Sequence, residues 1–226
     1  MALLLIAGIF GLSREGAKLV SQQKADKATV VLDAGHGGTD PGKIGVNGEK
    51  EKKLNLEIAL LLKKELEAHD IHVVLTRSSD EGLYDSNSKN KKVQDLQQRC
   101  ELIHKTAPDC MVSIHQNSYT TPEVRGAQVF YYTHSAEGKK LAEDLQSALV
   151  EKVDPDNNRL AKGNTSYYLL KKTDVPAAIV ECGFLSNPEE AQLLTSEEYQ
   201  KKLSKAICDG VLKYLGKSKK SDKSSR

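Results

Sequence analysis

Short apolar segments alternate with longer amphipathic segments through most of the chain. Six short segments rich in Val, Ile, Leu and Tyr predict strands, at residues 29–33, 72–76, 110–115, 127–132, 167–170 and 177–181. Apolar positions that recur with a 3.6-residue period predict helices, at residues 53–69, 93–105, 138–152, 189–194 and 197–215. This alternation is typical of α/β proteins. We therefore predict a single α/β domain with a mainly parallel, twisted sheet of about six strands, flanked by helices on both faces.

The two ends of the chain differ in composition from this central part. Residues 2–12 are apolar but too few to span a bilayer, so we expect residues 1–12 to be the remnant of a signal or membrane-anchor segment. An ordinary buried helix is the alternative for this segment. Polar residues 13–28 are interpreted as a linker, residues 29–216 as the folded domain, and residues 217–226, which include no apolar side chain, as a disordered basic tail. The linker favours export of the domain.

Length, charge and cysteine content limit the classes of function. The chain has 226 residues, which is enough to bury a sizeable core. Its 33 basic and 31 acidic side chains give a formal net charge of +2, so nothing in the charge balance indicates nucleic acid as a partner. The cysteines contain no Cys-x-x-Cys pair, which argues against a zinc knuckle, and a disulfide framework is unusual in a chain of this length. We expect all four to pack as small apolar side chains: Cys100, Cys110, Cys182 and Cys208.

Three of the predicted strands lead into polar residues that are common in metal sites. His36 lies in a glycine-rich turn after the first strand, His115 ends the third strand and Glu181 ends the last. Because ligands bind at the carboxyl ends of strands in open α/β sheets, we expect these side chains to meet at one edge. Glu51 begins the first long helix, where the helix dipole also favours a carboxylate. Two histidines and a carboxylate that leave one position open are common ligands in zinc hydrolases, and a second carboxylate, here Glu181, would take the proton of the attacking water.

Each of these residues also has an ordinary structural interpretation. A histidine in a glycine-rich loop can bond to the backbone, and a glutamate at a helix start is more often a partner of the helix dipole than a ligand. A glutamate at a strand end is commonly solvated or paired with a lysine. The residues taken singly leave both interpretations open. The other four histidines, on polar helix ends or loops, are expected at the surface: His69, His72, His104 and His134.

Five motifs occur in a fixed order and contain all four of these residues. They are DAGHGGTDPG at 33–42, EKKLNLEIA at 51–59, LTR at 75–77, SIHQN at 113–117 and PAAIVECGFLSN at 176–187. Together they resemble the N-acetylmuramoyl-L-alanine amidases of the type-3 family, which hydrolyse the amide bond between N-acetylmuramic acid and L-alanine in peptidoglycan. The resemblance covers residues 29 to about 215.

The family resemblance implies a cofactor and roles for particular residues. It implies one Zn²⁺ per chain, bound by His36, Glu51 and His115, with Glu181 as the catalytic residue. Glu49 is a nearby competitor for the second ligand position, but the spacing Glu-Lys-x-x-Asn-Leu matches Glu51. Two other classes stay open: a zinc peptidase that acts on stem peptides, and a non-catalytic wall-binding module. Retention of all four residues argues against the second of these.

A narrower likeness concerns the subfamily. The polar segment 78–92, residues 93–99 and residues 126–132 resemble the germination-specific cortex amidases of spore formers. This implies removal of peptides from spore cortex so that a second enzyme forms muramic-δ-lactam. It further implies an exported protein of the cell envelope or forespore intermembrane space of a Gram-positive spore former. The implied partners are peptidoglycan and an activating lipoprotein or a deacetylase.

Two residues are predicted to bind substrate, and one loop to regulate access. Asn117 follows His115 by two residues and Arg77 ends the second strand, so both are expected to face the cleft. The alternative for Arg77 is that it pairs with a structural carboxylate. For Arg99, such pairing is the preferred interpretation. Some members of the family that the chain resembles carry a long insertion here whose helix blocks the zinc. Residues 118–126 are too few for such a helix, so we expect an open cleft. The polar loop at 78–92 is long enough to form a lid or a partner surface.

Overall fold

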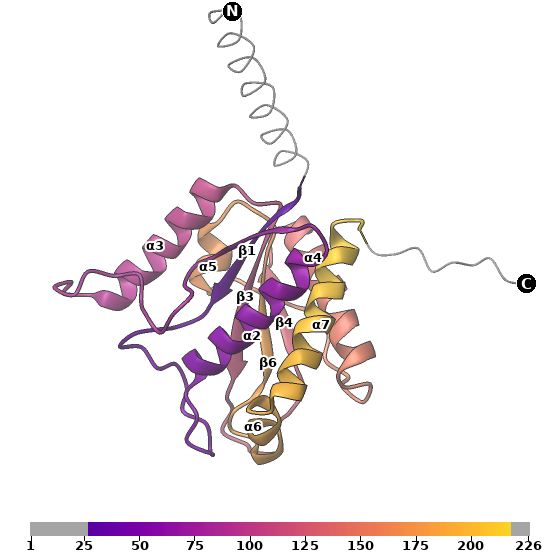
Figure 1. The fold of residues 1–226 in the computed structure, drawn as a ribbon. Coiled ribbons are helices and arrows are strands. Elements are labelled where there is room, and N and C mark those ends of the chain that lie inside the picture. Colours follow the sequence, from indigo (N-terminus) through magenta and orange to yellow (C-terminus); the bar gives the residue numbers. More distant parts are fainter. Residues whose placement is uncertain (1–26, 218–226) are drawn as a thin grey trace, which may run out of the picture.

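The computed structural model describes residues 27–217 (Figure 1). The expected signal or anchor segment, nearly all of the linker and nearly all of the tail lie outside the described residues. The strands are β1 (Thr29–Ala34), β2 (His72–Leu75), β3 (Cys110–Asn117), β4 (Gln128–Tyr132), β5 (Lys162–Asn164) and β6 (Ala177–Phe184). The helices are α2 (Glu51–Glu67), α3 (Lys91–Thr106), α4 (Ala136–Lys152), α5 (Tyr168–Lys172), α6 (Pro188–Leu194) and α7 (Glu197–Tyr214). Across the described range, no helix combines the length and the apolar character needed to cross a membrane.

The six strands form one sheet in the order β2-β1-β3-β6-β4-β5. Strands β2, β1, β3 and β6 are mutually parallel, β4 pairs antiparallel with β6, and β5 pairs parallel with β4. This confirms the prediction of a single α/β domain with a mainly parallel sheet. The carboxyl ends of β1, β3 and β6 therefore lie next to one another at one edge of the sheet.

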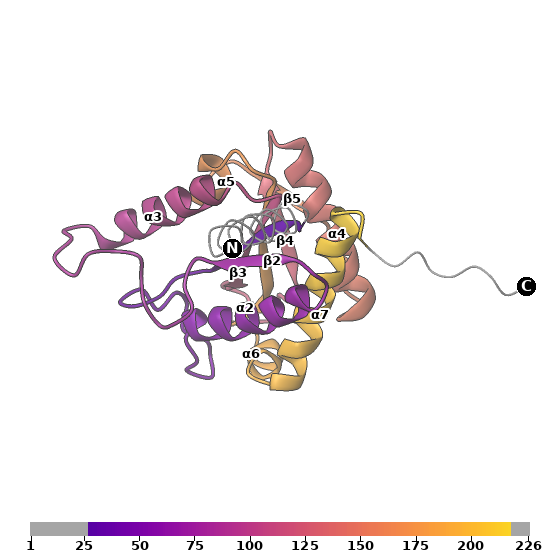
Figure 2. The same cartoon turned by 45° about the horizontal axis from the view of Figure 1, so that its top comes forward.

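Helices cover both faces of the sheet, but unequally. Helices α2, α4 and α7 pack on one face, and the shorter α5 packs beside α3 on the other (Figures 1 and 2). Side chains of β1 alternate between these layers: Val30 and Leu32 join the larger core, whereas Val31 joins the smaller core on the α3 and α5 face. All four cysteines are buried and free, as expected from the sequence.

One predicted strand is a helix. The apolar run at 167–170 predicts a strand, but the chain forms α5 there. The side-chain oxygen of Asn164 accepts hydrogen bonds from the backbone N–H groups of Ser166 and Tyr167, both at 2.7 Å, and this turns the chain out of β5. Leu169 and Leu170 are then buried in the smaller core. Strand β5, with only three residues and no apolar side chain among them, carries no pattern that predicts it.

Candidate active site

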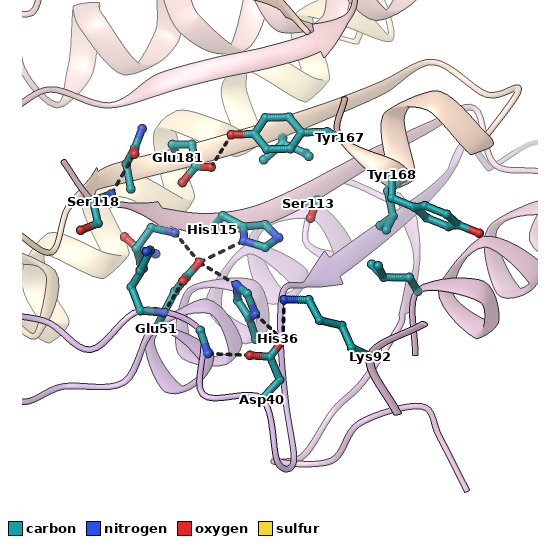
Figure 3. A pocket seen from close by; sticks show the side chains of 17 residues that line it. His36, Asp40, Glu51, Lys92, Ser113, His115, Ser118, Tyr167, Tyr168 and Glu181 are labelled. Atoms are coloured by element: carbon teal, nitrogen blue, oxygen red, sulfur yellow. Dashed lines mark hydrogen bonds and ion pairs between the residues drawn. The ribbon is translucent and has the colours of Figure 1, made fainter. Parts of the chain in front are cut away.

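A cleft with a volume of about 540 Å³ opens at the carboxyl ends of the central strands, on the face covered by α3 and α5 (Figure 3). It is lined by His36, Glu51, His115 and Glu181, the four residues that the sequence singles out. The first three come from three separate segments: the turn after β1, the start of α2 and the end of β3. Residues 118–126 contain no helix.

His36, Glu51 and His115 form a compact group of ligand atoms. Glu51 Oε1 lies 3.2 Å from His36 Nε2 and 3.0 Å from His115 Nδ1, and one ligand atom from each residue lies within 4.8 Å of the others. Within residues 27–217, no other three His, Cys, Asp or Glu side chains are grouped in this way. Zinc bonds of about 2.0–2.2 Å place neighbouring donors of a tetrahedral site roughly 3.3 Å apart, so the types of donor and their spacing fit a zinc ion.

Backbone groups hold the Glu51 carboxylate at this position. Oε2 accepts a hydrogen bond from the N–H of Lys43 at 2.8 Å, and Oε1 accepts one from the N–H of Gln116 at 3.1 Å. Burial by itself would raise the pKa of Glu51, but the contacts with the His115 and His36 rings outweigh it and hold this pKa far below its usual range. Glu51 is therefore a fixed carboxylate anion that joins the turn after β1, helix α2 and strand β3.

The close approach of the two histidine segments depends on a glycine. A Cβ atom on Gly35 would lie 2.2 Å from Nε2 of His115, which is closer than real contacts allow. The His36 and His115 rings meet edge to face, with centroids 5.0 Å apart. Glycine at position 35 thus lets β1 and β3 bring their histidines to one point.

Asp40 orients the His36 ring, a role that the sequence interpretation misses. Its Oδ2 lies 2.9 Å from Nδ1 of His36 (Figure 3). When Nδ1 donates its hydrogen to this carboxylate, Nε2 presents its lone pair toward Glu51, as a metal ligand must. The signal in the sequence is the carboxylate four residues after the histidine in GHGGTDPG.

Glu181 lies directly beside the group, because its Cα pairs with that of His115 across β3 and β6. The side chain is 7% exposed. Its Oε1 lies 3.4 Å from the Tyr167 hydroxyl, and its buried Oε2 has no hydrogen-bond partner within the described chain. Burial raises the pKa of Glu181 by more than the neighbouring His115 ring and the Tyr167 hydrogen bond lower it. A carboxylate with a raised pKa is suited to accept a proton and later to release it.

The two residues predicted to bind substrate have different positions. Asn117 lines the cleft, where its side-chain oxygen accepts a hydrogen bond from the N–H of Ser118 at 2.8 Å. Arg77 does not line the cleft and is 5% exposed. Its guanidinium donates to backbone carbonyls, including those of Ala34 at 2.8 Å and Lys52 at 2.7 Å. The interpretation of Arg77 as a substrate-binding residue is therefore corrected to a structural one, because its donors are already bonded inside the fold.

Comparison with known proteins identifies the family. The family model described as N-acetylmuramoyl-L-alanine amidase matches residues 30–213, which is nearly the whole described range. The chain belongs to this amidase family. In this amidase, the candidate metal ligands His36, Glu51 and His115 lie at the carboxyl ends of β1 and β3, within the matched region.

Several relatives of this amidase share most of its length. The germination-specific N-acetylmuramoyl-L-alanine amidase of Bacillus subtilis is 37% identical over 189 residues, which cover 82% of this chain and 79% of that protein. AmiA of Escherichia coli is 32% identical over 242 residues, which cover 88% of this chain and 80% of that protein. The structure of the CwlD amidase of Clostridioides difficile, in complex with the GerS lipoprotein, has a TM-score of 0.82 at 39% identity and covers 84% of this chain and 99% of that one.

Proposed function

We propose that the amidase hydrolyses the amide bond between N-acetylmuramic acid and L-alanine with one zinc ion held by His36, Glu51 and His115. The observation that carries this proposal is the convergence of those three ligands and the buried carboxylate of Glu181 in one cleft of a family member. Bound zinc supplies a Lewis acid that polarises the scissile carbonyl and lowers the pKa of water to about 7.

The chain's own residues provide the proton transfer. Oε2 of Glu181, which has no protein partner within residues 27–217, accepts the proton of the attacking water. The water oxygen bonds to the carbonyl carbon, the C–N bond breaks, and the same proton passes from Glu181 to the leaving amine of L-alanine. A raised pKa favours uptake of that proton by Glu181. The Tyr167 hydroxyl donates a hydrogen bond to Oε1 of Glu181, and the Asp40 carboxylate orients the His36 ring through Nδ1.

The proposal extends to biological setting. We place the amidase outside the cytoplasm, in the cell envelope or forespore intermembrane space of a spore former, with spore cortex as substrate. The likeness to the germination-specific amidase of Bacillus subtilis supports this setting. The likeness to CwlD, whose structure contains the GerS lipoprotein, supports a lipoprotein as activating partner.

Metal removal tests the zinc part of the proposal. We expect one zinc per chain by elemental analysis, loss of peptidoglycan hydrolysis on treatment with a chelator, and recovery on addition of zinc. The variant Glu51→Gln should lose zinc because it lacks a carboxylate between the two imidazoles. Glu49→Gln is the matched control, since Glu49 lies nearby and pairs with Lys53 at 3.0 Å instead. A metal-free preparation with full activity, or equal loss of zinc in both variants, would contradict the assignment.

Tyr167→Phe tests the positioning of Glu181. Loss of the hydroxyl removes the hydrogen bond to Oε1, so we expect kcat on peptidoglycan to fall roughly threefold to tenfold, with KM and zinc content unchanged. The neighbouring Tyr168 also lines the cleft, but its hydroxyl makes no hydrogen bond within the described residues, so Tyr168→Phe is the control. Equal kcat values in the two variants and the wild type would show that Tyr167 does not position the base.

A further inference from the structure

The first ligand histidine has an unfavourable backbone conformation. The φ angle of His36 is 62°, in the left-handed region that residues other than glycine rarely adopt. Such a conformation persists only where surrounding contacts hold it. Arg99 donates to the carbonyl oxygen of His36 at 2.7 Å, and Arg77 donates to that of Gly35 at 3.1 Å. The backbone on both sides of the His36 nitrogen is thus fixed by buried guanidinium groups.

The residues that follow form a tight turn, residues 36–40, which we name the His36 turn. Gly37 and Asp40 exchange two backbone hydrogen bonds, each 3.1 Å long. This pairing brings the Asp40 carboxylate back to Nδ1 of His36. A shift of the His36 turn would therefore move both the ligand and the carboxylate that orients it.

The segment 78–90, between β2 and α3, binds the outer side of the His36 turn. Oδ1 of Asp80 accepts a hydrogen bond from the N–H of Gly38 at 3.2 Å. Lys52 joins the same two residues, because its Nζ lies 2.7 Å from Oδ2 of Asp80 and 2.8 Å from the carbonyl oxygen of Gly38. Both polar groups of the Gly38 backbone are therefore bonded to Asp80 or to its partner.

Tyr84 makes the second connection between this segment and the His36 turn. Its hydroxyl accepts a hydrogen bond from the N–H of Thr39 at 2.7 Å and donates one to Oγ1 of Thr39 at 3.0 Å. The fit is close: a Cβ atom on Gly38 would lie 2.2 Å from this hydroxyl oxygen. Gly38 also has a positive φ of 56°, so glycine suits both the turn and its contact with Tyr84.

The segment is itself fixed to helix α3. The N–H of Leu83 donates to Asp95 at 2.7 Å, and the N–H of Asp85 donates to Gln94 at 3.0 Å. Asp95 also bonds Arg99 at 2.6 Å, the same arginine that reaches the His36 carbonyl. No residue of 78–90 lines the cleft, so the segment does not cover the site in this structure.

We propose that segment 78–90 is a brace for the His36 turn, and that Tyr84 and Asp80 are positioning residues which set the affinity of the site for zinc. The brace holds the turn from its outer side, where it fixes Gly38 and Thr39 next to Asp40. This inference rests on the proposed zinc site at His36, Glu51 and His115.

Zinc affinity of the full chain tests the brace. Competition between the protein and a chelating indicator, with Zn²⁺ alone as the ligand, gives the Kd. We expect Tyr84→Phe to raise this Kd about threefold to tenfold and Asp80→Ala to raise it about tenfold, with the melting temperature of the metal-free protein close to that of the wild type. Tyr132→Phe is the control, since this tyrosine does not line the cleft and its hydroxyl makes no hydrogen bond within residues 27–217.

The outcomes separate this inference from the proposed function. If the wild type binds one zinc and the Tyr84 and Asp80 variants bind it with wild-type affinity, the brace is wrong and the proposed site stands. If the wild type binds no zinc, the proposed site itself fails. If the Kd of Tyr132→Phe rises as much as that of Tyr84→Phe, the effect is not specific to the His36 turn and the brace is also overturned.

Discussion

Glu181→Gln is expected to lower kcat by about 10²-fold or more, with fold and zinc content unchanged. Glutamine keeps the shape of the side chain but cannot accept the proton of the attacking water. Glu181 is buried beside His115, and its Oε2 lacks a partner within the described chain. Of the other two carboxylates that line the cleft, Glu51 is a proposed metal ligand and Asp40 contacts His36, so Glu181 is the one placed for that proton. Steady-state kinetics on purified peptidoglycan, with zinc measured in the same samples, checks the prediction.

The matched control for this variant is Glu189→Gln. Glu189 carries the same side chain at an exposed position at the start of α6. The Glu189→Gln variant should therefore hydrolyse peptidoglycan at the wild-type rate. Near-normal turnover in Glu181→Gln would assign the proton transfer to another group. Loss of zinc from that variant would instead show that Glu181 contributes to metal binding.

Asp33→Asn is expected to lower the free energy of unfolding by about 2–4 kcal/mol. Asp33 is 1% exposed and accepts hydrogen bonds from Arg99 at 2.6 Å, Thr76 at 2.8 Å and Ser113 at 2.5 Å. Burial alone would raise the pKa of this carboxyl, but the positive Arg99 and the hydrogen bonds from Ser113 and Arg99 lower it to about 2. Asparagine would leave the Arg99 charge buried without this partner.

The pH dependence of that stability has a defined direction. Since the pKa of Asp33 is lower in the folded state than its ordinary value of 3.8, its contribution is present above about pH 4 and is lost as the pH falls toward 2. The difference between wild type and Asp33→Asn in urea unfolding should shrink over that range. Asp209→Asn, which breaks the more exposed pair with Lys152, should cost less than about 1 kcal/mol. Equal losses in the two variants would contradict a buried network at Asp33.

Most of the fold follows from the hydrophobic pattern because the central strands are buried on both faces. The predicted strands at 29–33, 110–115 and 177–181 read as apolar runs that end in polar residues, and α2 has one apolar stripe that faces the larger core. The hydrophobic pattern does not assign the run at 167–170 correctly, since four apolar residues fit a strand and a buried helical turn equally well. What decides between them is the Asn164 turn, a local contact with the backbone two and three residues later that the apolar pattern alone does not include.

The candidate site is predictable to the extent that its residues end strands or begin helices. Glu51 begins α2, His115 lies near the end of β3 and His36 lies just after β1, and the structure brings their ligand atoms together. The sequence interpretation does not identify Asp40 or Tyr167. The role of Asp40 depends on the left-handed turn at His36, and that of Tyr167 depends on the position of α5.

Arg77 shows the limit of reading side-chain direction from sequence. A position at the end of a strand does not tell whether a long side chain points into the cleft or folds back over the backbone. Here the guanidinium folds back and donates to the backbone carbonyl groups of Ala34 and Gly35 at the end of β1. The loop at 78–92 is a similar case: its length predicts a lid or partner surface, and in the structure its residues Asp80 and Tyr84 bond the turn beside the site.

Mass spectrometry of digested peptidoglycan tests the central claim most directly. The zinc-loaded amidase is incubated with purified peptidoglycan, with Glu181→Gln as the blank, and the soluble products are identified by mass. The proposed reaction predicts intact stem peptides with a free L-alanine amine, and glycan strands whose muramic acid carries a free lactyl carboxylate. Cleavage within the stem peptide would show a zinc peptidase, and an absence of products from a zinc-bound, peptidoglycan-bound chain would show a wall-binding module; either result contradicts the account.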